Sequence, residues 1–181
     1  MRAVELLPHD PAWAHVARAE AATLRRLLGD GLVAVHHIGS TAIAGIRAKP
    51  VVDLMAVVRD LSVLELQRDG LGARGYRWRG ENGLPGRRYC TKDDPATGRR
   101  LMHLHGYAEG SPGIARHLAF RDHLRGNPSL ALEYDREKER CQRLHRLDPR
   151  AYGDCKSTWI QRIEPDAVAA AGLAAKQPLT E

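Results

Sequence analysis

The sequence predicts an α+β fold, and three observations support this prediction. Short apolar and β-branched runs, typical of strands with at least one covered face, occur between residues 32 and 107. Helical periodicity dominates the remainder of the chain, where prolines and glycines separate three stretches. Strands grouped ahead of helices favour α+β over the alternating order of α/β proteins.

The N-terminal part is predicted to be a helix followed by two strands and a second helix. In "HDPAW", Asp10 can cap a helix and Pro11 suits its first turn, and apolar residues then recur at helical spacing up to Gly29. Strands are predicted over 32–38 and 51–58, which are rich in valine and other apolar residues. The next helical pattern covers residues 61–71 and ends at Gly72.

Three further strands and three helices complete the predicted order. The strands cover 76–79, 88–91 and 100–107, and the turn-rich "KDDPATG" joins the last two as a hairpin. Beyond "GSPG", helices are predicted over 114–124, 130–147 and 152–163.

The chain length indicates one domain. At 181 residues the chain can form one substantial core but not two domains of ordinary size. We expect that domain to cover residues 1–164. The alanine-rich segment 165–181, beginning at Pro165, is expected to form at most a frayed helix with a loose terminus.

Charge and composition indicate an anionic partner. The formal net charge is +6, which favours such a partner, but aromatic residues make up only 5% of the chain and there is a single phenylalanine. Because open nucleic-acid grooves use aromatic platforms for stacking, we expect a small phosphorylated molecule, such as a nucleotide, rather than RNA or DNA. The sequence leaves the oligomeric state open.

The cellular location is predicted from what the sequence lacks. No apolar run approaches the roughly 20 residues of a membrane span, and "MRAVELLPHD" has no apolar core of a secretory signal. We therefore expect a cytoplasmic protein without membrane association. Cys90, Cys141 and Cys155 are odd in number and widely spaced, so neither a disulfide framework nor a zinc knuckle is predicted.

The stretch "HHIGSTAIAGIRAKPVVDLMAVV", residues 36–58, contains the first candidate site. Backbone N–H groups of Gly39, Ser40 and Thr41 can surround phosphate oxygens, because glycine permits close approach and two hydroxyls add donors. The alternative is an ordinary turn in which Ser40 or Thr41 caps a short helix. Asp53 lies within an apolar strand, where a charge is costly unless it faces a cleft or a metal ion.

A second candidate group lies in "LMHLHGY". The period of two in a strand places His103 and His105 on one face. If that strand lies beside Asp53, two imidazoles and one carboxylate suit Zn²⁺, Mn²⁺ or Fe²⁺ better than Mg²⁺. The alternatives are polar residues on a half-exposed strand, or histidines that contact a phosphate directly.

Three charged residues of "GENGLPGRR" extend the candidate list. Glu81 offers a further carboxylate for a metal ion, and Arg87 and Arg88 can bind phosphate. Each is equally typical of a solvated loop charge.

The C-terminal helices carry a repeated tyrosine–lysine spacing. Tyr134 with Lys138, and Tyr152 with Lys156, are four residues apart and share a helix face. Such a face can bind a base by stacking and phosphates by charge, and Arg121 in "FRDHLR" is a candidate to join it. Amphipathic packing, with buried rings and lysines extending to solvent, is the alternative.

Taken together, these motifs resemble the GrpB family, and less closely the nucleotidyltransferase superfamily. The resemblance lies in "HDPAW", "HIGSTAIAGIRAKPVVDLMAVV", "GLPGRRY", "HLHGY", "LAFRDHLRGNP", "EYDREK" and "YGDCKSTWI", which span residues 4–163. It implies a nucleotidyltransferase-like mixed β-sheet with flanking helices and a helical C-terminal part. Family knowledge supplies no settled reaction, although members also occur fused to dephospho-CoA kinase.

The resemblance also implies a function and roles for residues. The expected activity is binding of a nucleoside triphosphate, ATP in the first place, and transfer of its nucleotidyl or phosphoryl group to a small acceptor. Ser40 and Thr41 would hold phosphates and Lys49 would neutralise their charge. Asp53 would take a divalent metal, Mg²⁺ or Mn²⁺ with Zn²⁺ as a further choice, or act as a base.

One departure from the superfamily pattern puts catalysis in question. Nucleotidyl transfer uses two or three carboxylates to hold two Mg²⁺ ions, and the second lies two residues after the first. Met55 occupies that position, and a thioether does not replace a carboxylate as a Mg²⁺ ligand. Two alternatives therefore stay open: a catalytically silent module that binds a nucleotide or a CoA precursor, and an RNA-binding protein.

Overall fold

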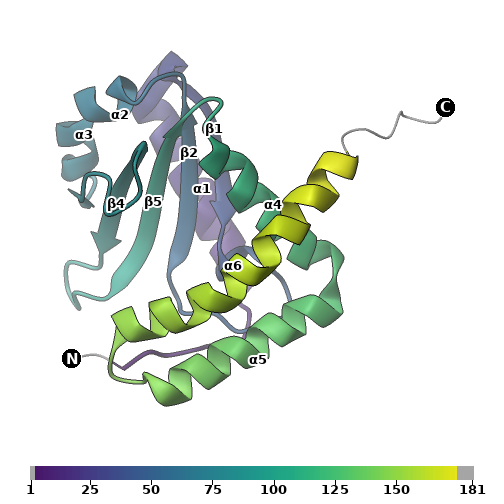
Figure 1. Cartoon of the computed structure of the whole chain (residues 1–181). Helices are drawn as coiled ribbons and strands as arrows, with labels where there is room; N and C mark the ends of the chain where they lie inside the picture. The colour runs from purple at the N-terminus through teal and green to yellow at the C-terminus, as the bar shows by residue number, and fades with distance from the viewer. Residues whose placement is uncertain (1–2, 175–181) are drawn as a thin grey trace.

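The computed structural model describes residues 3–174 and contains a five-stranded mixed sheet with helices on both faces (Figure 1). The spatial order is β1 (Leu32–Ile38), β2 (Val52–Val58), β5 (Arg100–Ala108), β4 (Arg87–Asp93) and β3 (Tyr76–Trp78). β2 and β5 are parallel, and the other neighbours are antiparallel. The predicted α+β class and the β4–β5 hairpin are confirmed.

Three helices cover one face of the sheet. They are α1 (Ala12–Leu28), α2 (Ser62–Leu66) and α3 (Arg68–Ala73). Their apolar side chains share a core with Leu54 and Ala56 of β2 and Leu104 of β5, all of which are buried. The helix predicted over 61–71 is two short helices, because the backbone leaves helical geometry at Gln67.

A second helical layer covers part of the other face. It contains α4 (Pro112–Gly126), α5 (Pro128–Leu144) and α6 (Pro149–Ala174), and α5 and α6 lie across one end of the sheet (Figure 1). Ile114 and Leu118 of α4 pack against Met55 and Val57 of β2. The sheet is therefore covered on this side mainly by α4.

The segment from Pro165 was predicted to be at most a frayed helix, and for residues 165–174 this prediction is wrong. α6 continues for 26 residues with Pro165 inside it, and the end of the predicted domain at residue 164 falls within this helix. Alanine has the highest helix propensity, and Ala167 is 1% exposed, so packing holds the segment helical. The rest of the predicted tail, 175–181, lies outside the described residues. In the described part of the chain, no helix combines the length and apolarity needed to cross a membrane.

The expectation of no disulfide is also wrong. Cys141 of α5 is bonded to Cys155 of α6, while Cys90 is free and buried. The two cysteines are 14 residues apart and meet only because α5 and α6 pack side by side. Such a pair has no local spacing signature of the kind that marks C-x-x-C sites.

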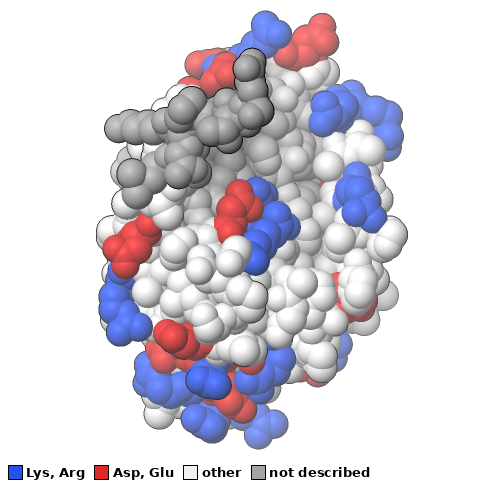
Figure 2. Space-filling view, turned by 90° about the vertical axis from the view of Figure 1, so that its right-hand side faces the viewer, with Lys and Arg blue, Asp and Glu red and all other residues white. Residues whose placement is uncertain are grey.

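Charged side chains are unevenly spread over the face seen in Figure 2. They are sparse on the middle of this face and crowd at its lower end, the end at which α5 lies in Figure 1. Basic and acidic groups are mixed there, so this lower end carries no continuous patch of one sign.

Candidate functional site

Asp53, near the start of β2, is the centre of the candidate site. The parallel pairing of β2 with β5 places Asp53 directly opposite His103, and Asp53, His103 and His105 point to one sheet face. Oδ1 of Asp53 lies 2.8 Å from Nδ1 of His103 and 3.9 Å from Nε2 of His105. The side chain of Asp53 is 25% exposed, so a ligand can reach it.

The charge of Asp53 is set by these imidazoles. Burial alone would raise the pKa of the carboxyl, but His103 and His105 outweigh this effect and hold the pKa well below its ordinary value. Because an ionised carboxylate only accepts hydrogen bonds, Nδ1 of His103 carries the hydrogen of this contact. Burial lowers the pKa of His105, which keeps that ring neutral.

Gly39 brings the turn after β1 directly against this carboxylate. Its φ is +70°, and a Cβ atom added there would lie 2.3 Å from Oδ2 of Asp53. Only glycine fits, for reasons of both backbone geometry and space. The sequence indicated a glycine that lets the backbone approach a phosphate, whereas its immediate neighbour is Asp53.

The two hydroxyls of the turn have different surroundings. Thr41 is 2% exposed and its Oγ1 lies 2.9 Å from Nε2 of His37, so its hydroxyl is used inside the protein. The structure therefore does not present Thr41 for phosphate binding. Ser40 begins the short 3₁₀ helix Ser40–Ala42, is partly exposed, and makes no side-chain hydrogen bond within the described residues.

Two arginines of α4 hold this turn in place. Arg121 donates to the carbonyl oxygen of His37 at 3.0 Å, and Arg125 donates to that of Ala42 at 2.8 Å. Arg121 also pairs with Asp122 at 2.7 Å. Arg121 thus positions the turn through its backbone and is not placed against Asp53. Sequence analysis missed Arg125, since its partner is 83 residues away.

Two lysines from distant segments converge on one aromatic ring, that of Tyr152. The ammonium groups of Lys49 and Lys156 lie 5.2 Å and 5.8 Å from the ring centre of Tyr152. Burial, together with the charge of Lys156, lowers the pKa of Lys49 to about 8, and the charge of Asp53 opposes this shift. The phenol of Tyr134 raises the pKa of Lys156 against the effect of burial, and Asp53 contributes in the same direction.

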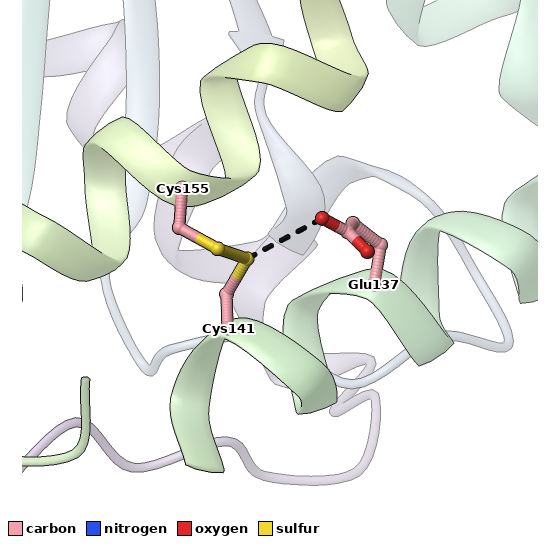
Figure 3. Close-up of side chains that lie close together, drawn as sticks. All are labelled: Glu137, Cys141 and Cys155. Atoms are coloured by element: carbon pink, nitrogen blue, oxygen red, sulfur yellow. Dashed lines mark hydrogen bonds between the residues drawn. A yellow bond between two sulfur atoms is a disulfide. The ribbon is translucent and has the colours of Figure 1, made fainter. Parts of the chain in front are cut away.

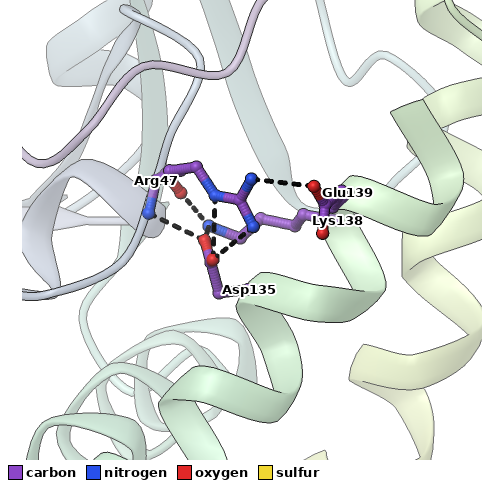
Figure 4. A network of polar contacts seen from close by, with 4 residues as sticks. All are labelled: Arg47, Asp135, Lys138 and Glu139. Carbon is purple, nitrogen blue, oxygen red and sulfur yellow. Dashed lines mark hydrogen bonds and ion pairs between the residues drawn. The ribbon is translucent and has the colours of Figure 1, made fainter. Parts of the chain in front are cut away.

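Lys138 has a different place from Lys156. It is 1% exposed, its Nζ donates to the carbonyl oxygen of Arg47, and it lies 3.4 Å from Oδ1 of Asp135 (Figure 4). Arg47 itself binds Asp135 through its guanidinium at 2.7 Å and its backbone N–H at 2.7 Å, and reaches Glu139 at 3.1 Å. This network fastens the loop that carries Lys49 to α5. Lys138 is fully engaged in it and is not available for phosphate.

Arg87 shares the face of Asp53 but is also engaged. It is 6% exposed, donates to the carbonyl oxygens of Glu81 and Asn82, and lies over the ring of Tyr89 at 4.7 Å. Tyr89 in turn lies 5.6 Å from the ring of His103. Arg87 therefore supports one wall of the site rather than offering its guanidinium to a ligand.

Arg88 and Glu81 are not brought to Asp53. Arg88 pairs with Gly106 in the sheet and points to the opposite face, where it binds Glu65 of α2. The carboxylate of Glu81 accepts the N–H of Gly86 at 2.8 Å and lies 3.6 Å from Arg88. A one-residue step along a strand reverses the face, which separates Arg88 from Arg87.

His117 of α4 is a site neighbour that sequence analysis missed. Its ring centre lies 5.4 Å from that of His105, and its Nε2 lies 3.4 Å from the hydroxyl of Tyr107. Burial, followed by the neighbouring His105, lowers its pKa to about 3. No local pattern links His117 to His105, because the packing of α4 brings them together.

The residues present do not fit a two-magnesium centre. Met55, at the position of the second carboxylate, is 0% exposed and lies under α4. In the part of the chain that the structure describes, the one set of three ligand-type groups in mutual reach is Glu137, Cys141 and Cys155. Asp53 and His103 form a hydrogen-bonded pair, with His105 3.9 Å from the same carboxylate oxygen. A metal ion at Asp53, His103 and His105 stays a prediction.

The fold is of a nucleotidyltransferase-like type. A mixed sheet with a Gly-Ser turn after one strand and a carboxylate on the next is a nucleotidyltransferase-like arrangement. A solved structure of Cid1 poly(U) polymerase with Mg 3′-dATP bound matches 83% of this chain and 49% of its own, with a TM-score of 0.54. At 13% identity this likeness concerns the fold alone.

The chain belongs to the GrpB family, whose model, described as GrpB protein, matches residues 3–166. It is 37% identical over 166 residues to the UPF0157 protein YqkA of Bacillus subtilis (strain 168), covering 92% of this chain and 48% of that protein. The chain thus spans about half the length of this relative. The crystal structure of the conserved protein GrpB from Enterococcus faecalis has a TM-score of 0.86 at 33% identity, covering 92% and 99% of the two chains.

Proposed function

We propose that the Asp53 site binds the phosphate groups of a nucleoside triphosphate, ATP in the first place, and supports transfer of its nucleotidyl or phosphoryl group to a small acceptor. The Asp53 site comprises Gly39, Ser40, Lys49, Asp53, His103 and Lys156. The observation that carries the proposal is the convergence of two ammonium groups on Tyr152. The charge of Lys156 contributes to lowering the pKa of Lys49, so an added negative charge would stabilise the protonated form of Lys49.

The electrostatics favour an anionic ligand. The pKa of Lys49 is lowered to about 8 by burial and by Lys156, so its ammonium lacks a full counter-charge. Asp53 supplies one negative charge, which is already hydrogen-bonded to His103. Phosphate oxygens at the two lysines would provide the missing charge, and the free hydroxyl of Ser40 would add a donor.

The proposed transfer assigns separate work to the residues present. Lys49 and Lys156 bind phosphate and neutralise its charge, and Asp53 holds His103 so that Nε2 can accept the proton of an acceptor hydroxyl. Asp53 offers one carboxylate, so the proposal includes at most a single divalent ion, Mg²⁺, Mn²⁺ or Zn²⁺, that enters with the nucleotide.

A second candidate function has its own support. Met55 stands where the superfamily has its second carboxylate, and its side chain is buried beneath α4 rather than open to a ligand. This arrangement favours a catalytically silent module that binds a nucleotide or a CoA precursor. The two candidates share the phosphate site and differ in turnover.

A thermal-shift screen tests the shared part of the proposal. ATP, other nucleoside triphosphates and dephospho-CoA would be added with and without Mg²⁺, Mn²⁺ and Zn²⁺, because a ligand of the folded state raises Tm. We expect ATP to stabilise the native protein, the control variant Arg88→Gln equally, and Lys156→Met much less. Stabilisation without any transfer product would favour the silent module, whereas no shift with any phosphorylated compound would contradict both.

A further inference from the structure

The Cys141–Cys155 disulfide joins α5 to α6 (Figure 3). Cys155 also lines an open cavity between these two helices, and no residue of the Asp53 site lines it. The cavity has a volume of about 800 Å³, and Cys155 is part of its lining. Four arginines also line it: Arg136, Arg140, Arg143 and Arg162. Two glutamates, Glu133 and Glu137, oppose them, so the wall is net positive.

The two sulfur atoms have different surroundings. Cys141 is 0% exposed and its Sγ lies 3.5 Å from a carboxylate oxygen of Glu137. Cys155 is partly exposed at the cavity, and its Sγ lies 3.4 Å from Nη2 of Arg140. The same Nη2 pairs with Glu137 at 2.7 Å and lies 3.8 Å from Sγ of Cys141, so the guanidinium is nearer to Cys155. A reagent that enters the cavity therefore meets the sulfur of Cys155 first.

The same surroundings would stabilise the two cysteines in their reduced form. A thiol on Cys141 can donate its hydrogen to the carboxylate of Glu137. A thiolate on Cys155 would lie against the guanidinium of Arg140, and a neighbouring positive charge favours the thiolate form. Glu137 and the two sulfurs are also close enough to hold a metal ion, but the adjacent Arg140 disfavours a cation there.

We propose that Cys141 and Cys155 form a redox-active pair, in which Cys155 is the sulfur attacked by anionic low-molecular-weight thiols that the arginines draw into the cavity. The thiolate of such a thiol attacks Sγ of Cys155 and the protein S–S bond breaks. The electron pair goes to Sγ of Cys141, which takes up the proton that the small thiol released. A mixed disulfide then joins Cys155 to the small molecule.

A second small thiolate completes the exchange. It attacks the small-molecule sulfur of the mixed disulfide and releases Cys155 as a thiolate beside Arg140. Two small thiols are oxidised to one small disulfide, and the protein disulfide is reduced to two cysteines, so electrons balance. The reverse sequence, starting from a small disulfide, re-forms the bond.

Charge selectivity in the native protein is the first test. The oxidised protein would be treated with glutathione, which is anionic, or with cysteamine, which is cationic, and quenched samples would be analysed by mass spectrometry. At low ionic strength, and at equal thiolate concentration, glutathione should reduce the disulfide about tenfold faster than cysteamine does. This preference should shrink as salt screens the arginines. Equal rates for both thiols, or a protein that forms no disulfide when treated with oxidised glutathione, would overturn the proposal.

Matched variants identify the attacked sulfur. Oxidised glutathione should form a mixed disulfide on Cys155 in Cys141→Ala, and far more slowly on Cys141 in Cys155→Ala. In the Cys141→Ala background, Arg140→Gln should slow the reaction about tenfold, while Arg26→Gln, on α1 and outside the cavity, should leave it within about twofold. Preferential modification of Cys141, or equal effects of the two arginine changes, would refute the assignment. The native comparison of thiols stands even if a variant fails to fold.

Discussion

Gly39→Ala is expected to displace the carboxylate of Asp53. The new Cβ would lie 2.3 Å from Oδ2 and 3.0 Å from Cβ of Asp53, well inside van der Waals contact, so the carboxylate must move. That movement breaks its 2.8 Å hydrogen bond to His103. The side chain would also be placed at φ +70° and ψ −172°, a region that is almost exclusive to glycine.

The expected cost combines two effects. Backbone strain in this region is about 1–3 kcal/mol, and loss of a hydrogen bond to a charged group is about 1.5–3 kcal/mol. We therefore expect Gly39→Ala to lower the free energy of unfolding by roughly 3–5 kcal/mol. Gly45→Ala is a useful comparison, because Gly45 also has positive φ but no atom lies within 4 Å of its added Cβ. It should cost about 1–2 kcal/mol.

Urea denaturation measures both variants, and a double-mutant cycle isolates the contact. In an Asp53→Ala background, Gly39→Ala should cost about 2 kcal/mol less than it does in the native protein, because the displaced carboxylate is gone. If Gly39→Ala proves no more costly than Gly45→Ala, or if the cost is unchanged in the Asp53→Ala background, the close approach of turn and carboxylate is refuted.

Three further predictions follow from other contacts. Asp135→Asn should lower the free energy of unfolding by about 2 kcal/mol, because Arg47 loses its principal ion pair. Glu139→Gln removes the more exposed partner of Arg47 and should cost under about 0.5 kcal/mol. Urea denaturation measures both variants, and equal midpoints would contradict this difference. Replacing both disulfide cysteines by alanine should lower the free energy of unfolding by about 3 kcal/mol, which is the chain-entropy value for a closed loop of this length. A variant with the same Tm as the native protein would count against the bond. ATP affinity, measured by titration calorimetry, should fall as pH rises above about 8, because Lys49 loses its proton in the free protein. Lys49→Arg should remove that pH dependence, and an unchanged profile would exclude Lys49 from the site.

Local patterns predicted the elements that surround the site. The strand 32–38, the Gly-Ser turn and the apolar strand of Asp53 all have signatures within a few residues, and the structure contains each of them. The period of two also placed His103 and His105 on one face, as the register of β5 shows. These features depend on neighbouring residues, which a sequence records directly.

What the sequence could not show depends on tertiary packing. Lys49 and Lys156 are more than a hundred residues apart and converge only because α6 packs beside the loop before β2. Thr41 and Arg121 have residue types suited to phosphate, but their donors are used within the fold. A residue type indicates which bonds a side chain can form, while the folded chain decides which of them remain available to a ligand.

Calorimetric titration of ATP tests most directly whether the Asp53 site holds a nucleotide. It would compare the native protein with the double variant Lys49→Met, Lys156→Met. Arg88→Gln is the control, because it removes a basic side chain from the opposite face of the sheet. We expect saturable binding to the native protein and to the control. Binding to the double variant should be at least about a hundredfold weaker, because two charged contacts to phosphate are lost. Equal affinity in all three proteins would place the nucleotide elsewhere, and absence of binding to the native protein would contradict the claim that the Asp53 site holds a nucleotide.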